Sequence, residues 1–76
     1  MNIGKAMQAI REEMGFSRYE MATALGLTPG ALWKVEKSKV WPKNATIVKF
    51  CRVTRTPLAF LIQGALALED YLIPSD

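Results

Sequence analysis

Residues 17–36 read SRYEMATALGLTPGALWKVE and contain the start and stop signals of two short helices. Ser17 and Glu20 have the spacing of a capping box, in which each side chain accepts a hydrogen bond from the other residue's backbone N–H. Gly26 then ends the first helix, because glycine enters the left-handed conformation of a helix terminus without steric cost. The first helix of this stretch is therefore expected to begin after Ser17 and to end before Gly26.

The second helix of the stretch begins directly after this turn. Thr28 is a good N-cap, and Pro29 fits the first helical position, where its missing N–H is not needed. Leu32 and Val35 are three residues apart and form the inner side of the helix. Two short helices joined by a turn that contains glycine are typical of a helix-turn-helix, here over residues 17–37. On these signals alone, a plain helical hairpin without a ligand is an equal alternative.

Several residues of this stretch carry a resemblance to a known family. Ala22 stands where this family has a small side chain at the crossing of the two helices, and Gly26 stands at the family's turn glycine. Leu32 and Val35 stand at the family's buried aliphatic positions. In this register the stretch resembles the lambda-repressor-like helix-turn-helix family (Cro and repressor type, xenobiotic-response-element family), and the resemblance extends over about residues 3–61. It implies an all-α fold, a compact bundle of about five short helices.

Apolar residues before the motif recur at helical spacing and predict a first helix. We expect Asn2 to cap this helix and Gly15 to end it. The family resemblance further implies that Arg11 forms a buried ion pair with Glu36, which fixes the register of the helices and has no catalytic role. The apolar side of the first helix is expected to consist of Ile3, Met7, Ile10 and Met14.

The chain after the motif predicts two further helices. The family often has glycine where Ser38 stands, so the second motif helix is expected to lack its left-handed cap. Trp41 is expected to pack at the edge of the core rather than against a DNA backbone. Asn44 is the expected N-cap of the fourth helix, and Thr56-Pro57 is the expected start of the fifth, by analogy with Thr28 and Pro29. Gly64 interrupts the apolar pattern and is a candidate end of that helix.

The net charge of +3 is distributed unevenly along the chain. Residues 17–55 carry eight basic and two acidic side chains, a local charge of +6, whereas the two ends together carry −3. A basic centre between acidic ends is typical of a surface that binds a polyanion, although a merely soluble basic protein is the alternative. The positive charge clusters on and just after the second motif helix, which favours polyanion binding.

In the family, the second motif helix lies in the DNA major groove and its N-terminal residues meet the base edges. Pro29 and Gly30 depart from the family pattern, because neither side chain can form the bidentate hydrogen bonds that identify a base. We expect Lys34 and Thr28 to donate hydrogen bonds to bases or phosphates, and the loop lysines to contact phosphates unless they are simply solvated. Arg18 stands where the family often has a phosphate-binding glutamine. The residues assigned to DNA binding are Arg18, Thr28, Pro29, Gly30, Ala31, Trp33, Lys34, Lys37, Lys39 and Lys43.

Residues 58–73 are more apolar than a free tail should be and have residues that favour a helix. We expect this segment to form the contact of a symmetric homodimer, since such a contact would cover an exposed apolar patch. The alternative is that the segment folds back onto its own domain. The residues assigned to the dimer interface are Leu61, Ala65, Leu68 and Leu72.

Composition excludes several classes of protein. The 76 residues are enough for one domain, 1–76. The chain has only one cysteine, Cys51, which excludes an internal disulfide. Because it also has no histidine, it cannot form a Cys/His metal cage. We expect no catalytic residues, no cofactor, no membrane span and a cytoplasmic location. The expected function is that of a sequence-specific DNA-binding transcription regulator of the Cro or repressor type that binds double-stranded operator DNA. The alternative is a protein-interaction module on the same fold, antitoxin-like or adaptor-like, whose protein partner the sequence does not identify.

Overall fold

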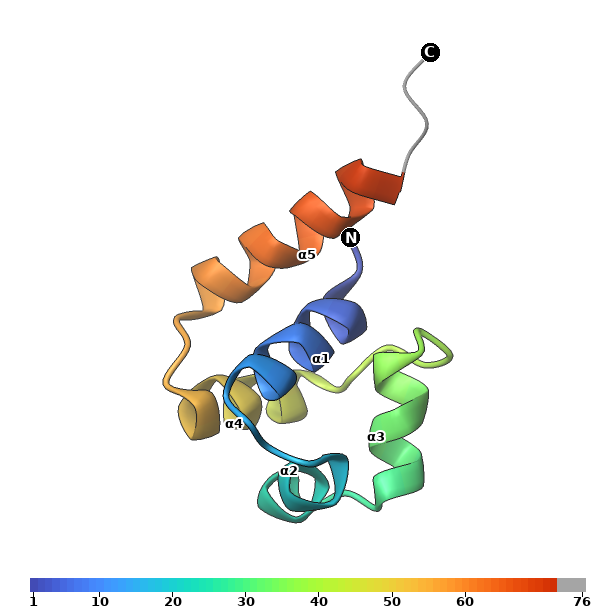
Figure 1. Ribbon diagram of the computed structural model, residues 1–76, viewed down its shortest axis with the longest axis vertical. Coiled ribbons are helices and arrows are strands. Elements are labelled where there is room, and N and C mark those ends of the chain that lie inside the picture. The colour runs from blue at the N-terminus through green and yellow to red at the C-terminus, as the bar shows by residue number, and fades with distance from the viewer. Residues whose placement is uncertain (73–76) are drawn as a thin grey trace.

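The computed structural model describes the backbone of residues 1–72 and the side chains of residues 1–68. Within this part of the chain all regular structure is helical, as expected from the sequence, and no helix is both long and apolar enough to cross a membrane. Figure 1 shows α5 lying along one side of α1, with α2 and α3 at the other end of the molecule. The helices are α1 (Ile3–Glu13), α2 (Arg18–Leu25), α3 (Pro29–Glu36), α4 (Asn44–Thr54) and α5 (Leu58–Leu72).

The local signals in residues 17–36 act as predicted. The backbone N–H of Glu20 donates to Ser17 Oγ over 3.0 Å, and the N–H of Ser17 donates to Glu20 Oε1 over 2.9 Å, which completes the capping box. Gly26 ends α2 in the left-handed conformation, with φ of 72°. Thr28 caps α3 by accepting from the backbone N–H of Ala31 over 3.1 Å. The turn between the two motif helices is therefore determined by residues within or next to it.

The core lies where α1 meets the other helices. α1 packs against α3, α4 and α5, while α2 packs against α3 and α4. Burying such apolar side chains supplies most of the driving force for folding. The largest fully buried side chains are Met7, Met21, Leu32, Phe50 and Leu61, which come from all five helices.

α1 and α3 approach each other closely at Gly4. A Cβ atom added to Gly4 would collide with the backbone carbonyl of Val35, so no larger residue fits there without moving a helix. Beside this contact, Asn2 caps α1 by accepting from the N–H of Lys5, and its Oδ1 also accepts from Ser38 Oγ over 2.8 Å. Ser38 itself has φ of 60°. The expectation that α3 lacks a left-handed end is therefore wrong, because a serine adopts that conformation.

Two helix boundaries differ from those expected from the sequence, whereas α1 ends as expected before Gly15, which is left-handed with φ of 80°. Met14 is the C-cap residue of α1, is 48% exposed and does not belong to the buried side. Asn44 is the first residue of α4 and not its cap, and the N-cap position belongs to Lys43. Gly64 lies inside α5 and does not end it, because neighbouring residues bury one side of the helix and hold it in place.

α5 begins one residue after Pro57, whose carbonyl accepts hydrogen bonds from the N–H groups of Phe60 and Leu61.

The loop before α4 also differs from expectation. Trp41 is 61% exposed and does not pack at the edge of the core, whereas the adjacent Pro42 is buried. This leaves a large aromatic side chain at the surface near α3.

The burial of Leu61 and Ala65 contradicts their assignment to a dimer contact. Leu61 and Ala65 are 0% exposed and lie in the core of their own domain, and Leu68 is half-buried against the same core. The carbonyl of Ala65 also accepts from the backbone N–H of Asn2 over 3.1 Å. α5 thus folds back onto its own domain, as in the alternative stated above. The side chain of Leu72 lies outside the described residues.

Candidate nucleic-acid interface

α3 has one side in the core and the opposite side at the surface. Leu32, Val35 and Glu36 are buried, whereas the exposed side consists of two rows at helical spacing. One row runs from Pro29 to Trp33, and the other runs from Gly30 to Lys34. The exposed rows begin at the first residue of the helix, so the N-terminal end of α3 is accessible to a ligand.

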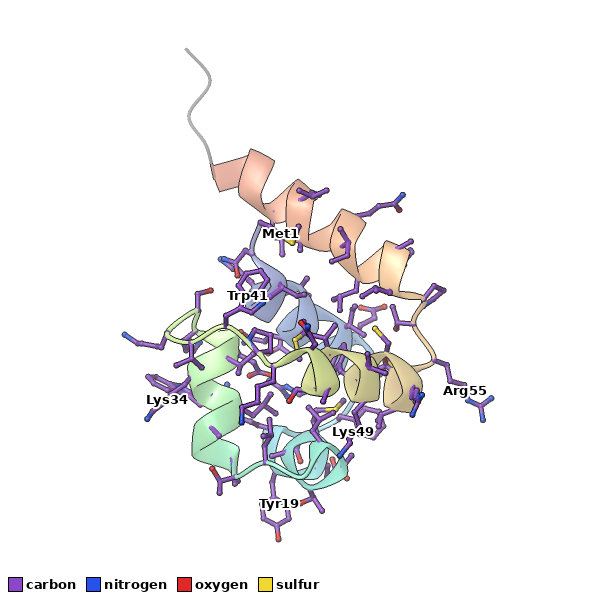
Figure 2. All side chains as sticks on the ribbon, turned by 180° about the vertical axis from the view of Figure 1, so that it is seen from behind. Met1, Tyr19, Lys34, Trp41, Lys49 and Arg55 are labelled. Atoms are coloured by element: carbon purple, nitrogen blue, oxygen red, sulfur yellow. The ribbon has the colours of Figure 1, made fainter. Side chains whose placement is uncertain are left out.

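Half of the residues assigned to DNA binding from the sequence surround one hollow of about 530 Å³. This hollow lies between the start of α3, the loop of residues 37–43 and the start of α4. Figure 2 shows Lys34 and Trp41 on this side of the molecule, and Arg55 on the other. The assigned residues that line the hollow are Thr28, Gly30, Ala31, Lys34 and Lys43.

The remaining assigned residues do not line this hollow: Pro29 and Trp33 are on α3, Lys37 and Lys39 follow its end, and Arg18 begins α2. Lys37 lines small hollows together with Lys5 and Gln8 of α1, away from the start of α3. The Nζ atom of Lys39 lies 6.0 Å from the centre of the Trp33 ring, a cation–π contact that places this lysine over the first exposed row. Lys37 is therefore the least well placed of these lysines to contact DNA together with Lys34.

The ion pair of Arg11 and Glu36 is present and buried, as the resemblance implied. Arg11 Nε donates to Glu36 Oε2 over 2.6 Å, and Arg11 Nη1 donates to the carbonyl of Phe16 over 2.8 Å. The side chains of Arg11 and Glu36 are only 7% and 1% exposed. The described buried side-chain atoms of this cluster all have hydrogen-bond partners, so the pair is fully satisfied.

Arg18 also binds Glu36, a contact that sequence reasoning missed. Arg18 Nε donates to Glu36 Oε1 over 2.9 Å, and the arginine side chain is 33% exposed. Arg18 therefore bridges the interior carboxylate and the surface at the start of α2. No local signal predicts this contact, because the two residues are 18 positions apart and meet only when α2 crosses α3.

The start of α4 was also missed, because Asn44 was assigned as its cap. The side chain of the N-cap residue Lys43 forms no hydrogen bond with the first backbone N–H groups of α4. These N–H groups have no acceptor within the helix either. These N–H groups lie beside the hollow that Lys43 and Thr46 line. Uncapped N–H groups and the helix dipole together favour an anion at a helix start.

Among the described titratable side chains, two have clearly shifted pKa values. The hydrogen bonds from Ser17 hold the pKa of Glu20 below its ordinary value, which keeps the capping box charged. Burial raises the pKa of the Cys51 thiol, which therefore stays protonated at neutral pH and is a poor nucleophile. No group of three His, Cys, Asp or Glu side chains among those described is arranged to hold a metal ion.

The chain is similar to known helix-turn-helix proteins. A family model described as "Helix-turn-helix" matches residues 7–61. A structure of the clp gene regulator ClgR from C. glutamicum has a TM-score of 0.83 and 21% sequence identity, over 88% of this chain and 87% of that chain. A second ClgR structure, from Corynebacterium glutamicum, has a TM-score of 0.84 and 22% identity, over 92% and 78% of the two chains. At such identities the likeness shows the fold alone. No curated protein sequence matches significantly.

Proposed function

The chain belongs to the helix-turn-helix family, a family of DNA-binding transcription regulators and not of enzymes, and from this premise we propose that it binds operator DNA with α3 in the major groove. We further propose that it acts in the cytoplasm as a homodimer of the Cro or repressor type. The observation that carries the proposal is the placement of Thr28, Lys34 and Lys43 around the exposed start of α3, with no acidic side chain among the residues that line this hollow.

Base recognition would depend on few side chains. Lys34 can donate to the O6 and N7 atoms of guanine, and the methyl group of Ala31 can contact a thymine methyl. Gly30 has open space around it, so the backbone of α3 can approach the base edges closely at this point. Because Pro29 and Gly30 provide no side-chain hydrogen bonds, we infer that DNA shape contributes part of the sequence preference.

Phosphate contacts would provide much of the affinity. Lys43 and the uncapped start of α4 lie on one side of the start of α3, and Arg18 lies at the start of α2. Glu36 holds Arg18 by its Nε atom, and the exposed third of the side chain remains accessible to a phosphate. Each phosphate that a cation neutralises releases counterions, so binding should weaken as the salt concentration rises.

A homodimer would use residues of α5 other than those buried in its own domain. The exposed apolar side chains of α5 include Phe60, at 63%, and Leu66, at 42%. A dimer would place two copies of α3 about one turn of DNA apart, on two half-sites. Sedimentation at tens of micromolar protein tests this part, and a monomer at that concentration would contradict it.

The DNA-binding proposal is tested by titrating the protein into a labelled duplex of mixed sequence at several salt concentrations, with fluorescence anisotropy as the readout. Lys34→Ala and Lys43→Ala should each weaken binding and flatten the salt dependence. Arg55→Ala, which removes a positive charge on the other side of the molecule, is the matched control and should change binding little. Absence of binding at low salt, or a salt-independent affinity, would contradict the proposal.

A further inference from the structure

The hollow beside α3 has an apolar wall that phosphate binding does not require. Val40 and Trp41 are 48% and 61% exposed, large fractions for such apolar side chains. Both line the hollow of about 530 Å³, together with Ala31 and Pro42. Exposed aromatic side chains beside a concave apolar surface are typical of protein–protein contacts, where tryptophan is a frequent hot-spot residue.

Val40 and Trp41 also line a second hollow, of about 270 Å³, on their other side. Ile3 and Val35 contribute to its wall. The two side chains thus form a ridge between two depressions, and a partner that covers the ridge can place apolar groups on both sides of it. We call this surface, made of Val40, Trp41 and the two hollows, the ridge surface.

The charges around the ridge surface have one sign. Lys34 and Lys43 line the larger hollow, and Lys39 lines the smaller one. No aspartate or glutamate is among the described residues that line either hollow. A complementary partner would therefore place carboxylates around an apolar centre.

We propose that the ridge surface binds a protein segment in which an apolar side chain is flanked by aspartates or glutamates. DNA fits the lysines, and Ala31 can meet a thymine methyl, but the proposed function assigns no DNA contact to the exposed Val40 and Trp41. The proposed segment would use Lys34 and Lys43, which the proposed function assigns to DNA. The acidic segment and DNA would then exclude each other, so that the partner releases the protein from its operator.

The probe for this proposal is a displayed library of random peptides, selected on the full chain. Peptides that are enriched are then synthesised and titrated against the wild type, Trp41→Ala and Tyr19→Ala. Tyr19 is the matched control, because it is 70% exposed and lies at the bottom end of the molecule in Figure 2, well away from Trp41. Since both side chains are exposed, circular dichroism should show that both variants fold as the wild type does.

The proposal predicts enrichment of peptides with a leucine or an aromatic residue among acidic residues. Trp41→Ala should weaken their binding by about tenfold or more, as at interface hot spots, while Tyr19→Ala should leave it unchanged. Replacing the acidic residues of a peptide by their amides should also weaken binding, and added salt should have the same effect.

Two results would overturn the proposal. One is a selection that yields no peptides, or only basic or uncharged ones. The other is binding that Trp41→Ala does not weaken. If Trp41→Ala instead weakened only the binding of mixed-sequence duplex, the ridge surface would belong to DNA alone and the proposal would fail.

A competition experiment separates this proposal from the proposed function. Unlabelled duplex should displace a bound acidic peptide, and simultaneous binding of both would contradict mutual exclusion. If acidic peptides bind at the ridge surface but no duplex binds, the docking site stands and the DNA-binding function fails. If a duplex binds but no peptide does, the function stands and the docking site fails.

Discussion

Arg18 Nε donates a hydrogen bond to Oε1 of Glu36 over 2.9 Å, which joins the first residue of α2 to the last residue of α3. The same carboxylate accepts from Arg11 of α1, so Glu36 connects three helices at one point. The two arginines differ in their surroundings, because Arg11 is buried and Arg18 is one third exposed. This difference leads to separate predictions for stability and for DNA binding.

Glu36→Ala should lower the free energy of unfolding by about 3–5 kcal/mol, because Arg11 would keep its buried charge without its partner. Chemical denaturation monitored by circular dichroism measures the change. Glu12→Ala is the control, since its side chain is 60% exposed and lies 3.8 Å from the same arginine. That control should cost less than about 1 kcal/mol. Equal effects of the two variants would contradict the structural role of Glu36.

Arg18→Gln should change stability by less than about 1 kcal/mol, because the pair is partly exposed and Glu36 retains Arg11. It should weaken DNA binding and reduce the salt dependence of binding by about one phosphate contact. Anisotropy titrations over a range of salt concentrations provide both values. Arg55→Gln removes the same charge on the side of the molecule away from Lys34 (Figure 2) and should leave the salt dependence unchanged. A variant of Arg18 with wild-type salt dependence would exclude this arginine from the DNA contact.

Gly4→Ala and Gly30→Ala should have opposite effects on stability. The added methyl group at Gly4 would collide with the backbone of Val35, a type of overpacking that costs about 1–3 kcal/mol or more. At Gly30 the methyl group meets no neighbouring atom within 4 Å, and alanine favours the helix by about 0.5–1 kcal/mol. Thermal melts of the two variants compare the positions directly. Destabilisation at Gly30 or tolerance at Gly4 would contradict this packing of α1 and α3.

Glu20→Gln should destabilise the protein at neutral pH and have less effect in acid. The pKa of Glu20 is lower in the folded state than its ordinary value of 4.5, so its charge stabilises the fold above that value. This contribution is lost as the pH falls through the lowered pKa, where the carboxylate becomes protonated. Denaturation curves of the wild type and the variant should therefore converge in acid. A difference that does not change with pH would exclude the charge of Glu20 as its cause.

The sequence predicted the elements that depend on near neighbours. The capping box of Ser17 and Glu20, the left-handed Gly26 and the cap at Thr28 each involve atoms within a few residues of one another. Their signals are therefore complete in the local sequence. The buried pair of Arg11 and Glu36 came from the family resemblance, because the two residues are 25 positions apart.

The features that the sequence missed depend on contacts between helices. α5 continues through Gly64 because Leu61 and Ala65 on either side of it are buried against the domain. This burial stabilises the helix by more than the glycine destabilises it. The same burial removes both residues from any dimer contact. The pairing of Arg18 with Glu36 likewise depends on how α2 and α3 are placed in space, and the exposure of Trp41 depends on the path of the loop between α3 and α4.

The central claim, sequence-specific DNA binding through α3, is tested most directly by selecting bound duplexes from a random-sequence DNA library near physiological salt. We expect enrichment of a two-fold symmetric site whose half-sites are about one helical turn apart. Lys34→Ala should alter the preferred base at one position of each half-site, because it removes a base contact. Recovery of duplexes without enrichment of any sequence would mean that the protein binds the DNA backbone and does not recognise a base sequence. Recovery of no duplex at all would contradict the claim.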